Sequence, residues 1–185
     1  MDYGRLKKMT DPLQCSLDML AAALEMEEKG QAFYEKAFKA CRNPQCREIF
    51  RSLSEEEVVH GQRIRQIHDT LSSGQCWTRN WEGLKGPSKT LGDLFRNLAG
   101  QEKKKIKAET SDLEAIDIAL DFESAGVKFY EDHLAKAVDP MEKAFLYKMI
   151  QEEKEHFRAL KDTRYYLTDP EGWFIEKERA GLDGS

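Results

Sequence analysis

The chain has 185 residues, of which 40% are hydrophobic and 34% charged, so it can bury a core without disulfides and is too apolar to be disordered. Its 29 basic and 34 acidic residues give a net charge of −5, which provides no electrostatic basis for binding nucleic acid. No apolar run is long enough to span a membrane, and no signal-peptide core opens the chain. We therefore expect a cytoplasmic protein that binds neither nucleic acid nor membranes.

Pairs of Asp or Asn followed by Pro mark the expected starts of the helices, because each pair offers an N-cap side chain and a proline at the first helical position. They occur at residues 11–12, 43–44, 139–140 and 169–170, and Ser111 with Glu114 has the spacing of a capping box. In chain order we expect helices over 12–41, 44–72, 91–107, 112–138 and 140–168, and a tail helix that begins near Glu171 within 169–185. The sequence thus predicts an all-α protein.

An internal repeat determines the expected architecture. Residues 23–35 align with residues 119–131 at an offset of 96, with seven of the 13 positions identical, and segment 56–60 aligns with 152–156 at the same offset. We therefore expect two copies of one helical hairpin, about 12–72 and 111–168, joined by a crossover over 73–110. Such a long crossover allows the helices 44–72 and 112–138 to run parallel, as in the single-crossover, ferritin-like four-helix bundle that we expect over residues 1–168.

Each main helix carries an apolar stripe that is interrupted by carboxylates or imidazoles. Buried carboxylates need charge compensation, and no Lys or Arg lies on these stripes. Two divalent cations would provide it, and carboxylate with imidazole is a ligand set suited to iron or manganese. Glu and His at positions i and i+3 share a helix face, so each E-x-x-H pair directs two ligands to one centre. The sequence predicts a dinuclear metal site formed by Glu27, Glu57, His60, Glu123, Glu153 and His156.

Several neighbouring residues fall outside this predicted site. Seven glutamates point off the stripes and are expected at the surface: Glu25, Glu28, Glu55, Glu56, Glu131, Glu152 and Glu155. We expect structural or surface roles for His68 and His133. Tyr34 and Tyr130 each follow a stripe glutamate by seven residues, and are either core aromatics, hydrogen-bond partners of a metal-bound carboxylate or redox-active phenols. Without metal, the four stripe carboxylates should raise one another's pKa.

The cysteines exclude one class of metal site. Cys15, Cys41, Cys46 and Cys76 form no C-x-x-C pair, so a four-cysteine zinc site or rubredoxin-type iron site is excluded. In a reducing cytosol we expect free structural thiols, with a redox disulfide as the alternative.

The arrangement resembles the ferritin-like di-iron carboxylate superfamily, and specifically its rubrerythrin-type domains. The motifs that carry the resemblance are Glu27 through Phe33-Tyr34, Glu57-x-x-His60, Glu123 through Phe129-Tyr130, and Glu153-x-x-His156. The resemblance implies two iron ions per chain, with Mn/Fe or other divalent pairs as alternatives. It also implies bridging roles for Glu57 and Glu153, terminal roles for Glu27 and Glu123, and a homodimer.

The sequence departs from the rubrerythrin pattern in two respects. It lacks the two Cys pairs of a rubredoxin domain, and Gly126 stands where the family carries an extra carboxylate one turn after the glutamate equivalent to Glu123. That leaves a ligand set similar to that of bacterioferritin.

The resemblance favours a rubrerythrin-like di-iron oxidoreductase that reduces peroxide or dioxygen with electrons from an external donor such as a rubredoxin-like protein. One alternative is an iron-handling protein, a ferroxidase or store, for which Fe(II) is the substrate. Another is a metal-binding bundle without catalysis. Metal stoichiometry separates the first two, because a catalyst keeps about two ions per chain and a store accumulates many.

Overall fold

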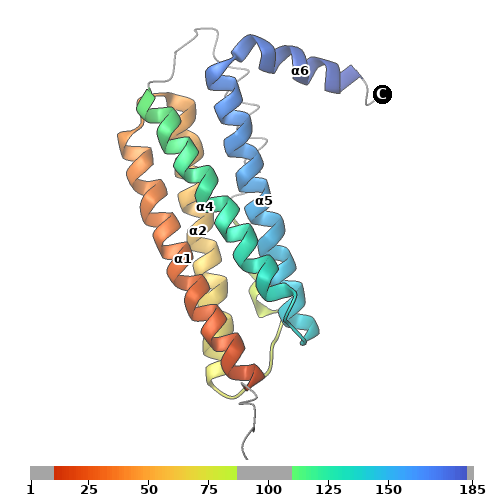
Figure 1. Cartoon of the computed structure of the whole chain (residues 1–185). Coiled ribbons are helices and arrows are strands. Elements are labelled where there is room, and N and C mark those ends of the chain that lie inside the picture. Colours follow the sequence, from red (N-terminus) through yellow and green to blue (C-terminus); the bar gives the residue numbers. More distant parts are fainter. Residues whose placement is uncertain (1–10, 87–109, 183–185) are drawn as a thin grey trace, which may run out of the picture.

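The computed structural model describes residues 11–86 and 110–182, and within these ranges the ordered elements are all helical (Figure 1). They are α1 (Pro12–Ala40), α2 (Pro44–Ser72), a 3₁₀ helix η1 (Asn80–Gly83), α4 (Thr110–Leu134), α5 (Pro140–Thr168) and α6 (Pro170–Leu182). The predicted all-α class is confirmed. In the described ranges, each helix is too short or too polar to cross a membrane.

The four long helices lie side by side, with α1 antiparallel to α2 and α4 antiparallel to α5 (Figure 1). Hydrogen bonds between the hairpins fix which ends meet. The Asp112 carboxylate on α4 accepts the backbone N–H groups of Arg42 and Asn43, just before α2, at 3.2 and 3.1 Å. Ser16 on α1 donates to Glu142 on α5 at 2.9 Å. Because α2 and α4 begin at the same end, they run parallel, as in a single-crossover ferritin-like bundle.

The predicted caps account for where the helices start. Asp11 accepts the Leu13 N–H at 3.1 Å, Asn43 and Asp139 each accept two backbone N–H groups of α2 and α5, and Asp169 accepts the Gly172 N–H at 2.9 Å. These bonds satisfy amide groups that a helix N-terminus leaves unpaired.

Three predicted boundaries differ from the structure. Helix α1 ends at Ala40, one residue early, and α4 contains Ser111 in its first turn, so the predicted capping box at Ser111 is wrong. Helix α4 ends at Leu134 rather than at residue 138, because the N–H groups of Lys136 and Ala137 both bond to the His133 carbonyl and close the last turn. Asp139, the cap of α5, has an extended backbone conformation. The predicted helix over 91–107 lies outside the described residues.

Two apolar clusters fill the bundle on either side of a polar layer. The first contains Tyr34, Phe50, Leu53, Ile116 and Leu160, and the second contains Leu20, Ile64, Tyr130, Phe145 and Met149, among others. In each long helix, the predicted metal ligands lie between the residues of these two clusters. The core therefore encloses the polar residues at mid-height of the bundle and shields them from water.

Candidate metal centre

All six predicted ligands lie in this buried layer, each with at most 5% of its surface exposed. Their ligand atoms form two groups in which all atoms lie within 4.8 Å of one another: Glu27, Glu57 and His60, and Glu57, Glu123, Glu153 and His156. Glu57 belongs to both groups. Glu153 also reaches both imidazoles, because its Oε1 lies 3.3 Å from His60 Nδ1 and its Oε2 lies 3.8 Å from His156 Nδ1. Two carboxylates therefore lie between two histidines.

The two imidazoles turn the same nitrogen toward the carboxylates. His60 Nδ1 lies 3.2 Å from Glu27 Oε2, and His156 Nδ1 lies 3.4 Å from Glu123 Oε2. The rings stack with their centroids 5.3 Å apart and their planes at 14°. Both Nε2 atoms consequently face away from the carboxylate layer, toward the opposite hairpin.

Each Nε2 atom contacts a glutamate that was predicted to lie at the surface. His60 Nε2 on α2 lies 3.3 Å from Glu152 Oε2 on α5, and His156 Nε2 on α5 lies 3.0 Å from Glu56 Oε2 on α2. The side chains of Glu152 and Glu56 are only 14% and 19% exposed, so the prediction for these two residues is wrong. A position one residue off the stripe faces the neighbouring helix, and the repeated Glu-Glu pairs 56–57 and 152–153 are the sequence signal of this contact.

The remaining predictions for nearby residues agree with the structure. Glu25, Glu28, Glu55, Glu131 and Glu155 are exposed. His68, with 40% of its side chain exposed, lies beside Asp69, and His133 packs on the ring of Phe129 with centroids 4.6 Å apart. Neither histidine belongs to the buried cluster.

Buried Arg63 makes the two halves of the centre inequivalent. Its guanidinium donates to Glu152 and to the Leu84 carbonyl, at 3.1 Å from Nε and 2.8 Å from a terminal nitrogen. The bonds to the Leu84 carbonyl hold the segment after η1 against α2. The position equivalent to Arg63 in the second hairpin is Ala159, so α5 supplies no arginine to Glu56. The carboxylate behind His60 is therefore neutralised by a cation from α2, and the carboxylate behind His156 has no such residue at the matching place.

Tyr34 and Tyr130 brace the two hairpins across the layer. The Tyr34 hydroxyl on α1 donates to Glu123 on α4, and the Tyr130 hydroxyl on α4 donates to Glu27 on α1. Burial, followed by the nearby carboxylates, raises the pKa of both phenols, so they remain protonated donors. Both phenols are thus core aromatics that hydrogen-bond to carboxylates of the cluster.

The pKa values of the four carboxylates shift in two opposite directions. Burial and the neighbouring charge of Glu27 or Glu123 raise the pKa of Glu57 and Glu153 well above its usual range. Burial would also raise the pKa of Glu27, but hydrogen bonds from Glu57, His60 and Tyr130 lower it to about 2. The pKa of Glu123 is lowered in the same way, against burial, mainly by His156. The expectation that all four values rise is wrong. The tyrosines donate only to Glu123 and Glu27, whereas at Glu57 and Glu153 burial and the neighbouring carboxylate charges outweigh the contribution of His60.

Several polar atoms of this layer have no hydrogen-bond partner among the described residues. They are Glu57 Oε2, Glu123 Oε2, Glu153 Oε1 and His156 Nδ1. An unsatisfied buried polar atom costs about 1–3 kcal/mol, and more when it is charged. All four belong to predicted ligands, and each of the three oxygens lies within 3.5 Å of a histidine Nδ1. The donor set and these unsatisfied atoms fit bound divalent metal ions.

A small cavity adjoins the carboxylates on the side of two glycines. It holds about 20 Å³, room for about one water-sized molecule, and is lined by Met26, Glu27, Gly30, Tyr34, Glu57, Phe122, Glu123, Gly126 and Glu153. A Cβ atom at Gly126 would lie 3.3 Å from Glu153 Oε2, and one at Gly30 would lie 3.6 Å from Glu57 Cδ. The glycines thus leave space directly beside the two carboxylates that lie between the histidines.

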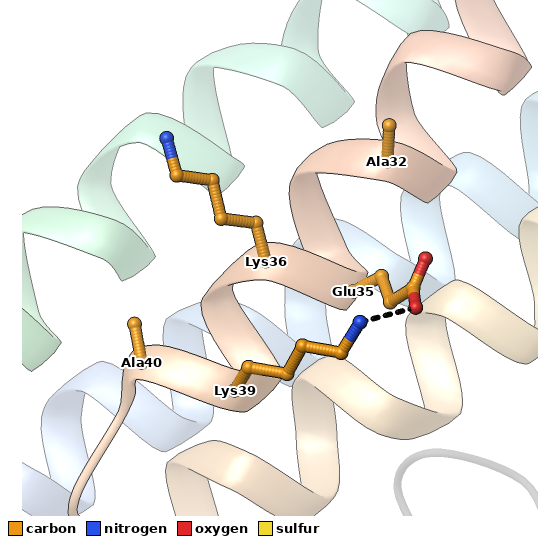
Figure 2. Close-up of a pocket in the computed structure, with 5 residues that line it drawn as sticks. All are labelled: Ala32, Glu35, Lys36, Lys39 and Ala40. Carbon is orange, nitrogen blue, oxygen red and sulfur yellow. Dashed lines mark hydrogen bonds and ion pairs between the residues drawn. The ribbon is translucent and has the colours of Figure 1, made fainter.

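A second hollow lies on the outer surface of α1, away from the carboxylate layer. Ala32, Glu35, Lys36, Lys39 and Ala40 line it, and Lys39 pairs with Glu35 in the exposed i,i+4 manner (Figure 2). With both side chains more than half exposed, this pair is solvated and contributes little to stability or binding. The cluster in the bundle core is therefore the candidate functional site.

The fold and the site together define a ferritin-like helical bundle with a buried carboxylate–histidine cluster able to bind metal. The sequence profile of the Rubrerythrin family matches residues 18–163, which contain all six predicted ligands. The chain belongs to the rubrerythrin family. Comparison with curated proteins and with solved structures gives no significant match.

Proposed function

We propose that the buried cluster binds two iron ions, one beside each histidine. The observation that carries this proposal is the set of unsatisfied Glu and His atoms within the two buried groups of ligand atoms. Glu57 and Glu153 would bridge the ions, because each lies between both histidines. Glu27 and Glu123 would be terminal ligands, and His60 and His156 would each bind one ion through Nδ1.

We further propose that the protein is an oxidoreductase that reduces peroxide or dioxygen. A bound pair of Fe(II) ions would supply the two electrons that reduction of one peroxide takes. The chain contributes the carboxylates that offset the metal charge and the phenols that orient Glu27 and Glu123. The cavity beside Gly30 and Gly126 has room for a small oxygen species.

Repeated turnover requires a source of electrons outside the iron site. The sequence has neither a C-x-x-C dithiol nor a G-x-G-x-x-G dinucleotide motif. We expect anaerobically reduced, iron-loaded protein to consume about one equivalent of peroxide per chain in a rapid phase, and to need a donor such as a rubredoxin-like protein for a second rapid phase. Stopped-flow absorbance, with titration of the remaining peroxide, measures both the rate and the stoichiometry.

The same experiment distinguishes the alternatives. Rapid consumption of many equivalents without a donor would contradict the need for an external reductant. An iron-handling protein would instead accumulate many ions per chain when Fe(II) is supplied with oxygen, and elemental analysis would reveal this. Because Gly126 replaces the additional carboxylate of the family, we expect dioxygen to compete with peroxide as the oxidant. A rate with peroxide many times the rate with dioxygen would show that this carboxylate is dispensable.

The carboxylates behind the histidines should affect metal affinity without being ligands. Glu152→Gln and Glu56→Gln each replace a charged acceptor of a histidine N–H by a neutral amide, which lowers the basicity of the imidazole and loosens its orientation. We expect each change to weaken metal binding about 10- to 100-fold. Competition with a chelator measures the affinity. Glu155→Gln, at an exposed position of the same helix as Glu152, is the control and should bind metal normally.

Because Arg63 pairs with Glu152, we expect the two variants to differ in stability. In Glu152→Gln the buried Arg63 loses its carboxylate partner, so this variant should also lose more stability than Glu56→Gln. Equal thermal melting temperatures for the two variants would contradict the inequivalence of the two halves.

A further inference from the structure

Two buried thiols face each other at the turn between α1 and α2. Cys41 follows the last residue of α1, and Cys46 is the third residue of α2. Their sulfur atoms lie 3.2 Å apart, with the Cys46 thiol donating to Cys41 Sγ. A disulfide bond is about 2.05 Å long, so closing this gap requires a movement of about 1.2 Å by the two side chains. All four cysteines are free thiols, and Cys15 and Cys76 are exposed.

The backbone of this turn is held in place without a covalent bond. The Asn43 side chain accepts the N–H groups of Gln45 and Cys46 at 2.9 and 3.1 Å. The Asp112 carboxylate on α4 accepts the N–H groups of Arg42 and Asn43. The thiols are therefore positioned by fixed elements on both sides.

The hairpin does not need sulfur at these positions in order to fold. At the offset of 96, the positions equivalent to Cys41 and Cys46 in the second hairpin are Ala137 and Glu142, while the cap Asn43 corresponds to the cap Asp139. The same hairpin thus forms with alanine and glutamate in place of the two cysteines. Packing alone does not explain a pair of thiols in contact.

A metal ion is the other occupant that these residues could take, since Cys41, Cys46 and Asp112 have ligand atoms within 4.8 Å of one another. Both Asp112 oxygens already accept backbone N–H groups, however, and the group provides three ligands where a closed structural zinc site has four. The cluster is also free of the unsatisfied atoms that mark the carboxylate layer. The contact favours sulfur–sulfur chemistry.

We propose that Cys41 and Cys46 form a reversible intrachain disulfide, with hydrogen peroxide as the oxidant and a dithiol as the reductant. The reduced pair holds two electrons, the number that one peroxide molecule takes. This proposal does not depend on bound iron, and it adds a second redox-active site to the chain, separate from the carboxylate cluster.

The geometry assigns different roles to the two sulfurs. Cys41 accepts the hydrogen bond from Cys46 and is 5% exposed, against 1% for Cys46, so we assign Cys41 as the sulfur that peroxide reaches first. The hydrogen bond to Cys41, together with burial, raises the pKa of the Cys46 thiol, which keeps its proton.

The reaction proceeds in two balanced steps. The Cys41 thiolate attacks one peroxide oxygen, the O–O bond breaks, and the leaving hydroxide takes a proton to become water, which leaves a sulfenic acid on Cys41. The Cys46 sulfur then attacks Cys41 Sγ, the S–S bond forms, and the sulfenic oxygen leaves as a second water with the Cys46 proton. In total, two thiols and one peroxide give one disulfide and two water molecules. We expect the reaction of Cys41 with peroxide to be slow, because both sulfurs are buried and peroxide has little access to them.

The test uses metal-free protein carrying Cys15→Ser and Cys76→Ser, so that only the buried pair can react. We expect peroxide to remove two hydrogen atoms from the intact mass, to abolish alkylation of both remaining thiols after unfolding, and to link Cys41 to Cys46 in a peptide map. A dithiol reductant should restore both thiols. With Cys46→Ser added, Cys41 should gain one oxygen and react with a sulfenic-acid probe. With Cys41→Ser added, Cys46 should react at least tenfold more slowly.

Circular dichroism of each variant checks that the helices are intact, and the two-serine background alone decides the main question if a further variant fails to fold. Two alkylatable thiols after exposure that fully oxidises Cys15 and Cys76 in the unmodified chain would overturn the proposal. Stoichiometric Zn²⁺ binding by the background protein that is lost in Cys41→Ser would also overturn it, in favour of a metal site. Because no iron is present, neither outcome bears on the proposed di-iron function.

Discussion

Replacing Glu57 by alanine should reduce the metal content of the purified protein to about one ion or fewer per chain. Glu57 belongs to both groups of ligand atoms, so its loss removes an oxygen from each proposed ion and leaves the charge less compensated. By the repeat, Glu153→Ala should behave in the same way. His60→Ala and His156→Ala each remove one nitrogen ligand and should also lower the metal content to about one ion or fewer.

Elemental analysis of the variants after iron loading measures these effects. His68→Ala and His133→Ala are the matched controls, because both residues lie on the same bundle but outside the buried cluster, and both variants should retain full metal content. Full occupancy in all four ligand variants would rule out the proposed site.

Metal-free protein should become less stable as the pH rises from about 5 to 8. The pKa values of Glu57 and Glu153 are raised by burial, so the folded chain keeps protons that the unfolded chain releases above about pH 4.3. The pKa values of His60 and His156 are also raised, by Glu152 and Glu123 among others and against burial. Their contribution is complete below about pH 6.5 and is lost above it. The free energy of unfolding of the metal-free protein therefore decreases with rising pH at all four groups.

Glu27 and Glu123 act in the opposite sense, but at lower pH. Their pKa values are lowered in the folded state, to about 2 for Glu27, so their contribution is present above about pH 4.5 and is lost only on acidification. Metal bound only by the folded form should offset much of the alkaline loss, by about 2.7 kcal/mol at a free concentration of 100 times Kd. Thermal melts of metal-free and iron-loaded protein across this range test the prediction. A metal-free curve that does not depend on pH would indicate that the carboxylates are solvated.

The sequence was sufficient to predict the features that depend on periodicity and local capping. The Asp/Asn-Pro pairs predicted the starts of α1, α2 and α5, and the stripes through Glu57 and Glu153 predicted which side chains enter the core. Both signals are local to one helix. The repeat then placed the two halves in register, which is why all six buried residues could be named.

The features that the sequence did not reveal depend on how one helix faces another. Glu56 and Glu152 lie one residue off their stripes, and only the spacing of α2 and α5 decides that they reach the histidines rather than water. The buried Arg63 was missed for the same reason, because its partner carboxylate belongs to the other hairpin. The splitting of the carboxylate pKa values depends in turn on the tyrosine contacts across the layer.

The reciprocal bonds of Tyr34 and Tyr130 relate the two hairpins by a pseudo-twofold axis. Each hairpin donates a tyrosine hydroxyl to a glutamate of the other and accepts one in return. Neither hairpin alone assembles the centre, since each tyrosine and each histidine depends on a glutamate of the opposite hairpin. Separation of the hairpins must therefore break the tyrosine bonds and the proposed metal bridges together. Bound metal should accordingly slow global unfolding more than it accelerates folding, so that the loaded protein is protected kinetically as well as at equilibrium.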